Sequence, residues 1–108
     1  MEAAQKKAQA LIDENAVMIF SKSYCPYCRD AKSVFSTRDV KYKAVELNQM
    51  DDGDDIQDAL QKMTGQRTVP NIFIGGTHIG GSSDLNNVVS SGKDGKSIDV
   101  LLKEAGAL

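Results

Sequence analysis

The two cysteines of this 108-residue chain are the residues whose type and spacing could do chemistry. Cys25 and Cys28 form a C-x-x-C pair within the stretch Ser23–Cys28. An apolar run before the pair, Ala16–Phe20, predicts a buried strand, and residues 29–35 after it predict a helix. A cysteine pair at a strand-to-helix junction is typical of proteins that exchange thiols and disulfides.

The position of Cys25 at the start of the helix predicts a reactive thiol. An ordinary cysteine has a pKa of about 8.5, whereas the thiolate is the form that attacks a disulfide. Cys25 would face free backbone N–H groups and the positive end of the helix dipole, and Lys22 would add a positive charge nearby. Cys28 lies one turn further along, so we expect it to be more buried. We therefore predict that Cys25 is the nucleophile and that Cys28 resolves the mixed disulfide on Cys25.

Two other uses of a cysteine pair are less favoured. A structural disulfide between Cys25 and Cys28 would close a very short loop and would constrain little of the unfolded chain. A structural zinc ion usually takes four ligands, and the chain offers only these two cysteines and His78. We therefore expect no metal site and read His78 as structural.

Composition excludes several classes of function. The chain has a formal net charge of −2, which gives no reason to expect binding to nucleic acid or to a membrane surface. No apolar run is long enough to span a bilayer, and residues 1–7 lack the layout of a secretory signal. Two cysteines in a redox motif suit a reducing compartment. We expect residues 1–108 to form one domain and to be cytoplasmic.

Hydrophobic periodicity and turn residues predict an α/β order of elements. Asp54 or Asp55 could cap the third helix, and Gly65 suits its end. A strand near residues 42–47 is expected to run parallel to the first strand. The expected helices are 2–15, about 25 to 37–39, about 55–64, one capped by Ser82, Ser83 or Asp84 that runs through about residue 90, and about 96–105. The expected strands are about 16–21, 42–47, 71–74 and 77–79, the last two joined by a turn at Gly75-Gly76.

Three separated motifs, Cys25–Cys28, Thr68–Pro70 and Gly80–Asp84, occur in an order that resembles a dithiol glutaredoxin. The resemblance covers nearly the whole chain. It implies a thioredoxin fold, with a four-stranded mixed sheet flanked by about five helices and with Pro70 in cis beside the active cysteine. It also implies glutathione as reductant and co-substrate, with no permanently bound cofactor.

The resemblance also implies a set of glutathione-binding residues. Cations and an amide donor suit the glycine carboxylate, Val69 would pair its backbone with the cysteinyl part, and a helix start with Ser83 and Asp84 would receive the γ-glutamyl end. Tyr24 and Tyr27 would flank the reacting sulfurs. Surface exposure, ring packing and helix capping are the structural alternatives for these side chains. The implied set is Lys22, Tyr24, Tyr27, Gln57, Arg67, Thr68, Val69, Pro70, Gly81, Ser83 and Asp84.

The expected function is reduction of protein–glutathione mixed disulfides and other disulfides, by a monomer whose partners are glutathione and the oxidised proteins. One alternative is an iron–sulfur protein with Cys25 and glutathione as cluster ligands. The C-G-F-S motif associated with cluster transfer in the family is absent, which disfavours that alternative. A second alternative is a thioredoxin-type reductase, against which the Thr68–Pro70 and Gly80–Asp84 motifs argue.

Overall fold

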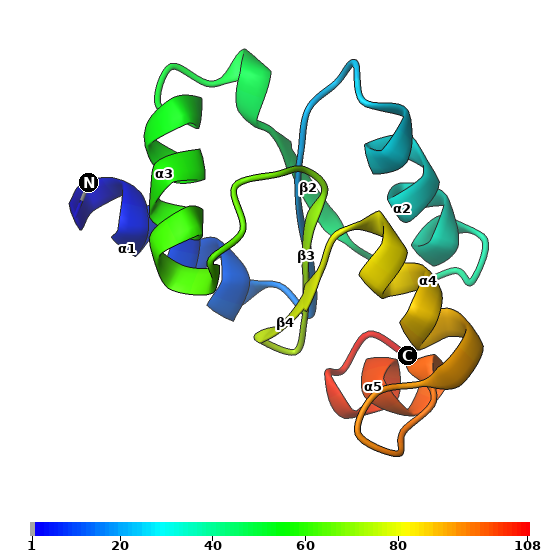
Figure 1. Ribbon diagram of the computed structural model, residues 1–108. Helices are drawn as coiled ribbons and strands as arrows, with labels where there is room; N and C mark the ends of the chain where they lie inside the picture. Colours follow the sequence, from blue (N-terminus) through cyan, green and yellow to red (C-terminus); the bar gives the residue numbers. More distant parts are fainter. Residues whose placement is uncertain (1) are drawn as a thin grey trace.

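A computed structural model describes residues 2–108 as ten elements in the order α-β-α-β-3₁₀-α-β-β-α-α (Figure 1). The five α-helices and four strands agree with the predicted order, and the short 3₁₀ helix was not predicted. No helix among the described residues is both long and apolar enough to cross a membrane. The bounds are α1 Glu2–Glu14, β1 Val17–Ser21, α2 Pro26–Ser36, β2 Lys43–Glu46, η1 Leu47–Gln49, α3 Gly53–Thr64, β3 Asn71–Ile74, β4 Thr77–Gly80, α4 Ser82–Ser91 and α5 Ile98–Glu104.

The four strands form one mixed sheet in the order β2-β1-β3-β4. β1 pairs with β2 in parallel, as predicted, and with β3 antiparallel, so it is a central strand. All five residues of β1 are buried, which is why its sequence is a continuous apolar run rather than an alternating one. The hairpin of β3 and β4 turns at Gly75 and Gly76, which both have positive φ, the geometry of a tight hairpin loop.

Helices cover both faces of the sheet and bury two apolar clusters, so the expected four-stranded mixed sheet with five flanking helices is confirmed (Figure 1). Successive residues of β1 point to opposite faces, as strand geometry requires. Met18 and Phe20 pack with α1 and α3, while Val17 and Ile19 pack with α2, α4 and α5. β1, which leads into the cysteine pair, is therefore held by both apolar clusters.

Three predicted helix starts were wrong. α4 begins at Ser82 with Gly81 as its N-cap residue, so none of residues 82–84 precedes the helix, although the Asp84 carboxylate accepts a hydrogen bond from the Gly81 amide. Neither Asp54 nor Asp55 caps α3, because the helix already begins at Gly53 and both acids lie in its first turn. There they complement the positive end of the helix dipole. The last helix begins at Ile98 rather than residue 96, because the Ser97 side chain accepts a hydrogen bond from the Val100 amide and caps it.

Candidate active site

The sulfur of Cys25 caps the amino terminus of α2, where the sequence placed the nucleophile. Cys25 has an extended backbone, its Sγ accepts a hydrogen bond from the Cys28 amide at 3.4 Å, and Pro26 opens the helix. Proline is well suited to this first position because it has no N–H to leave unpaired. An amide that donates to sulfur stabilises its charged form, as does the helix dipole. This site can therefore support a thiolate.

Cys28 differs from Cys25 in its surroundings, as predicted. Its side chain is completely buried, whereas Cys25 is half-buried, and both thiols are free. Burial raises the pKa of the Cys28 thiol, an effect opposed by the Lys22 backbone amide and reinforced by the neighbouring Cys25. Burial therefore favours the protonated form of the Cys28 thiol at neutral pH.

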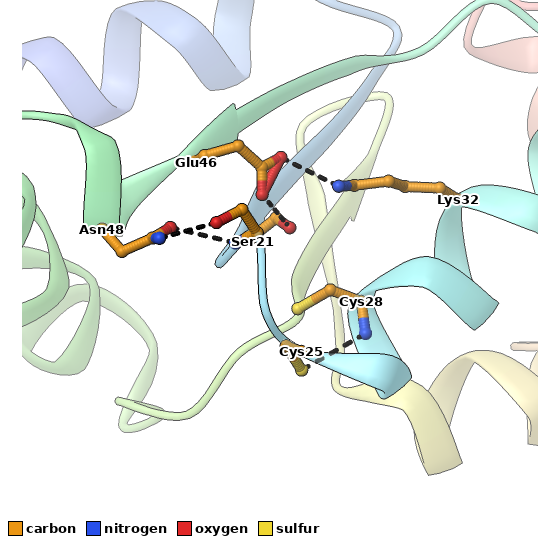
Figure 2. A network of polar contacts seen from close by, with 7 residues as sticks. Ser21, Cys25, Cys28, Lys32, Glu46 and Asn48 are labelled. Atoms are coloured by element: carbon orange, nitrogen blue, oxygen red, sulfur yellow. Dashed lines mark hydrogen bonds and ion pairs between the residues drawn. The ribbon is translucent and has the colours of Figure 1, made fainter.

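The loop that carries Cys25 is fastened to η1 by two hydrogen bonds. The Ser23 amide donates to the Asn48 side-chain oxygen at 2.9 Å, and the Asn48 side-chain amide donates to the Ser23 hydroxyl at 2.7 Å. Figure 2 shows Asn48 reaching this loop from beside the end of β2. The Cys25 amide also donates to the Lys22 carbonyl at 3.1 Å. These bonds fix the turn that carries Cys25.

A cavity of about 390 Å³ opens beside Cys25. The Cys25 thiol lies 4.0 Å from the carbonyl oxygen of Val69, which lines the cavity, so the sulfur stands at its margin. The volume falls in the range of pockets for small molecules. The lining residues are Tyr27, Gln66, Thr68, Val69, Pro70, Gly81, Ser82, Ser83 and Asp84.

The segment before β3 forms one wall of this cavity. The Val69–Pro70 peptide bond is cis, as the resemblance implied. Gln66 was missed from the sequence, yet its side-chain amide donates to the carbonyls of both Thr68 and Pro70 at 3.1 Å. Because one side chain braces both ends of this short segment, the Val69 backbone is presented in a fixed orientation.

The amino terminus of α4 forms another part of the cavity wall. Asp84 stands in the first turn, and its carboxylate accepts a hydrogen bond from the Gly81 amide at 2.9 Å. The first amides of a helix have no partner within it, so this wall offers hydrogen-bond donors to a negative group. Gly80 has φ of 119°, and a Cβ atom there would overlap the Asp84 carboxylate. Glycine at this position lets the carboxylate lie close against the backbone.

The structure gathers seven of the eleven predicted glutathione-binding residues around the cavity. Lys22, Tyr24, Gln57 and Arg67 lie outside its lining. Gln57 is buried and its side-chain amide donates to the Arg67 carbonyl at 2.8 Å, while the Arg67 guanidinium contacts Asp58. Tyr24 and Tyr27 both project into solvent, 67% and 65% exposed, which excludes a role for either ring in core packing.

His78 is hydrogen-bonded rather than isolated. Its Nε2 lies 2.8 Å from the side-chain oxygen of Asn71, and its ring lies against Phe73 with 5.0 Å between centroids. Burial lowers the pKa of His78 below its ordinary value. Among the described residues, no three His, Cys, Asp or Glu side chains gather as a metal site would require.

Known proteins share both this sequence and this fold. The glutaredoxin family model matches residues 17–79. Glutaredoxin-C2 of Arabidopsis thaliana is 49% identical over 97% of this chain and 91% of its own length, and a glutaredoxin of Ricinus communis is 49% identical over 97% and 99%. A crystal structure of a buckwheat glutaredoxin–glutathione complex superimposes with a TM-score of 0.90 and 42% identity, covering 99% of this chain and 94% of that one. With this match running through the cysteine pair, the cis proline and the fold that holds them, the chain belongs to the glutaredoxin family.

Proposed function

We propose that this chain is a glutathione-dependent thiol–disulfide oxidoreductase that reduces protein–glutathione mixed disulfides through Cys25. The observation that carries the proposal is the Cys25 sulfur at the amino terminus of α2, beside the Val69 carbonyl at the margin of a peptide-sized cavity. The similar buckwheat glutaredoxin has been crystallised as a glutathione complex, which supports the same ligand here.

Glutathione would lie along the cavity with its cysteine next to Cys25. Its cysteinyl backbone would pair with Val69 as an added strand, a common way of recognising an extended peptide. Its γ-glutamyl carboxylate would meet the amides at the start of α4, and its ammonium would face Asp84. Thr68, Pro70, Gly81 and Ser83 would complete the walls.

The glycine carboxylate would extend toward Lys22 and Arg67, beyond the cavity's lining. Arg67 would share its guanidinium between this carboxylate and Asp58, its present partner. Gln57 would act indirectly, because its amide already holds the Arg67 carbonyl. Tyr24 and Tyr27, both exposed beside the sulfur, would contact the protein substrate or its glutathione.

The reaction proceeds by exchange of thiols. Cys25 thiolate attacks the glutathione sulfur of a mixed disulfide, which forms an enzyme–glutathione disulfide and releases the protein as a thiolate that takes up a proton. A second glutathione then attacks the glutathione sulfur, which regenerates Cys25 and yields glutathione disulfide. In the two-cysteine route, Cys28 attacks Cys25 instead and releases reduced glutathione. The chain would work as a monomer in a reducing compartment such as the cytoplasm.

The proposal is tested with a small glutathione mixed disulfide, with glutathione reductase and NADPH reporting turnover. Cys25→Ser should reduce activity to the uncatalysed background, because no nucleophile remains. Cys28→Ser should keep most of the activity, because a second glutathione can complete the cycle. Ser33→Ala, on the exposed face of α2, is the matched control. Full activity of the Cys25→Ser variant, or equal turnover with thioredoxin reductase as electron donor, would refute the proposal.

A further inference from the structure

A polar network lies next to Cys28 and outside the lining of the cavity. Ser21 is fully buried at the end of β1, and its hydroxyl donates to one carboxylate oxygen of Glu46 at 2.7 Å. Lys32 donates to the other oxygen at 2.8 Å, and both members of this ion pair are about four-fifths buried. Figure 2 shows the three side chains converging above the two cysteines. None of the three lines the glutathione cavity.

The fold directs this network at Cys28. Ser21 and Glu46 are register partners on β1 and β2, so their side chains share one face of the sheet. That face is the one covered by α2, since Ile19, two residues before Ser21, packs in the same cluster as α2. Lys32 lies on α2 one turn after Cys28, on the same side of the helix.

The hydroxyl of Ser21 has one proton and two possible acceptors. A hydrogen bond from Ser21 would lower the pKa of Cys28, because it would stabilise the thiolate. In the structure the proton is given to Glu46 instead. A thiolate at Cys28 would therefore compete with the Glu46 carboxylate for this donor, and the Lys22 backbone amide is the other group that supports it.

We infer that the Lys32–Glu46 pair, acting through Ser21, sets the rate at which Cys28 resolves a mixed disulfide on Cys25. Glu46 keeps Cys28 in its thiol form by holding the Ser21 proton, and Lys32 limits this effect by neutralising the carboxylate. Slow resolution leaves time for a second glutathione to attack, so Glu46 favours the one-cysteine route. The inference rests on the proposed function. On this inference Ser21, Glu46 and Lys32 do not contact the substrate but act through Cys28 on its attack at the mixed disulfide.

The charged and titratable groups that face Cys28 are few. Cys25 at the N-cap of α2 interacts with Cys28 directly, Lys32 stands one turn further along α2, and Glu46 on β2 contacts Lys32 and Ser21, whereas Lys22 acts through its backbone. The strand β3 has no titratable side chain, and the side chains that α4 buries against this cluster are the apolar Leu85 and Val88. A change in the pH dependence of Cys28 after substitution of Glu46 or Lys32 can therefore be assigned to that charge.

The test follows the two thiols separately with a chromogenic aromatic disulfide, 5,5′-dithiobis(2-nitrobenzoate), mixed in equimolar amount with the reduced protein. Cys25 thiolate attacks one sulfur, which forms a protein–aryl disulfide and releases one coloured aryl thiolate. Cys28 then loses its proton to buffer and attacks Cys25, which forms the Cys25–Cys28 disulfide and releases the second aryl thiolate. The aryl disulfide is reduced by two electrons and the two protein thiols are oxidised. The second phase reports Cys28 alone.

Two isosteric substitutions break the same ion pair and should have opposite effects. Glu46→Gln should raise the fraction of Cys28 present as thiolate about tenfold at pH 7. A thiolate of lower pKa is also a weaker nucleophile, so the second phase should become only about threefold faster. Lys32→Met should slow the second phase about threefold, because it leaves the Glu46 carboxylate uncompensated. The Glu46→Gln rate should also reach its plateau at lower pH, and that plateau should lie below the wild-type one. Ser33→Ala is the control on the same helix.

Each remaining outcome overturns part of the account. If both substitutions slow the second phase alike, the ion pair only holds α2 in place. If Glu46→Gln slows it and high pH restores the rate, the carboxylate is a base for Cys28 rather than a restraint. If the second phase is absent from the wild type, Cys28 does not resolve and the inference fails. Absence of the first phase would instead refute Cys25 as nucleophile and with it the proposed function.

Discussion

Asp84 joins two roles that substitution can separate: it caps α4, and we propose that it binds the ammonium group of glutathione. Its carboxylate already accepts the Gly81 amide at 2.9 Å, and it lines the cavity. Asp84→Asn keeps an oxygen that can accept this bond but removes the charge. Asp84→Ala removes both.

The two roles predict different magnitudes for the two variants. Loss of a capping side chain costs about 1 kcal/mol, which in a domain of this size lowers Tm by about 4–8 °C, so Asp84→Ala should show this fall and Asp84→Asn about half of it. A hydrogen bond to a charged group contributes about 1.5 kcal/mol at the low end, appropriate to an exposed carboxylate, which corresponds to about tenfold in affinity. The KM for glutathione should therefore rise about tenfold in both variants.

The assay compares glutathione with an analogue that lacks the α-amino group of its γ-glutamyl residue. Wild-type protein should use the analogue with a KM about tenfold higher, whereas Asp84→Asn should hardly distinguish the two. Asp99→Asn, an acid in the first turn of α5, controls for loss of one negative charge. If Asp84→Asn and wild type discriminate equally between the two ligands, Asp84 does not contact the ammonium and serves only as a cap.

Three further substitutions test other parts of the fold. Gln66→Ala should raise the KM for glutathione by about three- to tenfold with a smaller change in kcat, because two hydrogen bonds of about 1 kcal/mol each brace the segment before β3; an unchanged KM would refute that role. Gly53→Ala should lower the free energy of unfolding by more than about 2 kcal/mol in urea titrations, because the new Cβ would overlap the Leu47 carbonyl oxygen. A loss below about 0.5 kcal/mol, which is the effect of a neutral surface substitution, would contradict this reasoning. The pKa of His78 is lower in the folded chain than in the unfolded chain, so the unfolded chain takes up a proton first as the pH falls. The free energy of unfolding should therefore decrease as the pH drops through about 6.5, and His78→Gln should remove this part of the decrease. Identical pH profiles for the two proteins would show that His78 does not titrate in this way.

The parts of the site that depend on neighbours in the sequence could be predicted from it. The apolar run of β1, the turn and Pro26 lie within ten residues of one another, and together they place Cys25 at a helix start. The same local signals placed the Gly75-Gly76 turn and the Gly65 cap, where positive φ favours glycine.

The start of α3 shows where local signals were insufficient. Aspartates are common helix caps, so Asp54 and Asp55 were reasonable candidates. The actual start depends on Gly53, which is buried against the Leu47 carbonyl of the unpredicted 3₁₀ helix. A contact between two turns of backbone has no signature in residue type beyond the glycine itself.

Gln66 and Glu46 were missed for a different reason, since their roles exist only across the fold. Gln66 is an unremarkable polar residue in the sequence until the chain turns and places the Thr68 and Pro70 carbonyls within reach. Glu46 meets Ser21 only because β1 and β2 pair in a particular register. The sequence did contain one signal of the polar network beside Cys28. Lys32 stands four residues after Cys28, so the two side chains had to lie on the same side of the helix.

The two thiols of one short motif end in environments that suit opposite states of sulfur. Cys25 is half-buried at the margin of the cavity, where the Cys28 amide donates to its sulfur, and Cys28 lies fully buried, where burial raises the pKa of its thiol. The helix determines this difference, because three residues of α-helical rise move the second sulfur under the protein surface. On the proposed function, exchange with glutathione at Cys25 would be separate from closure of the Cys25–Cys28 disulfide. The proposed effect of Ser21, Glu46 and Lys32 would then change the balance between the two without altering the cavity, since none of the three lines it.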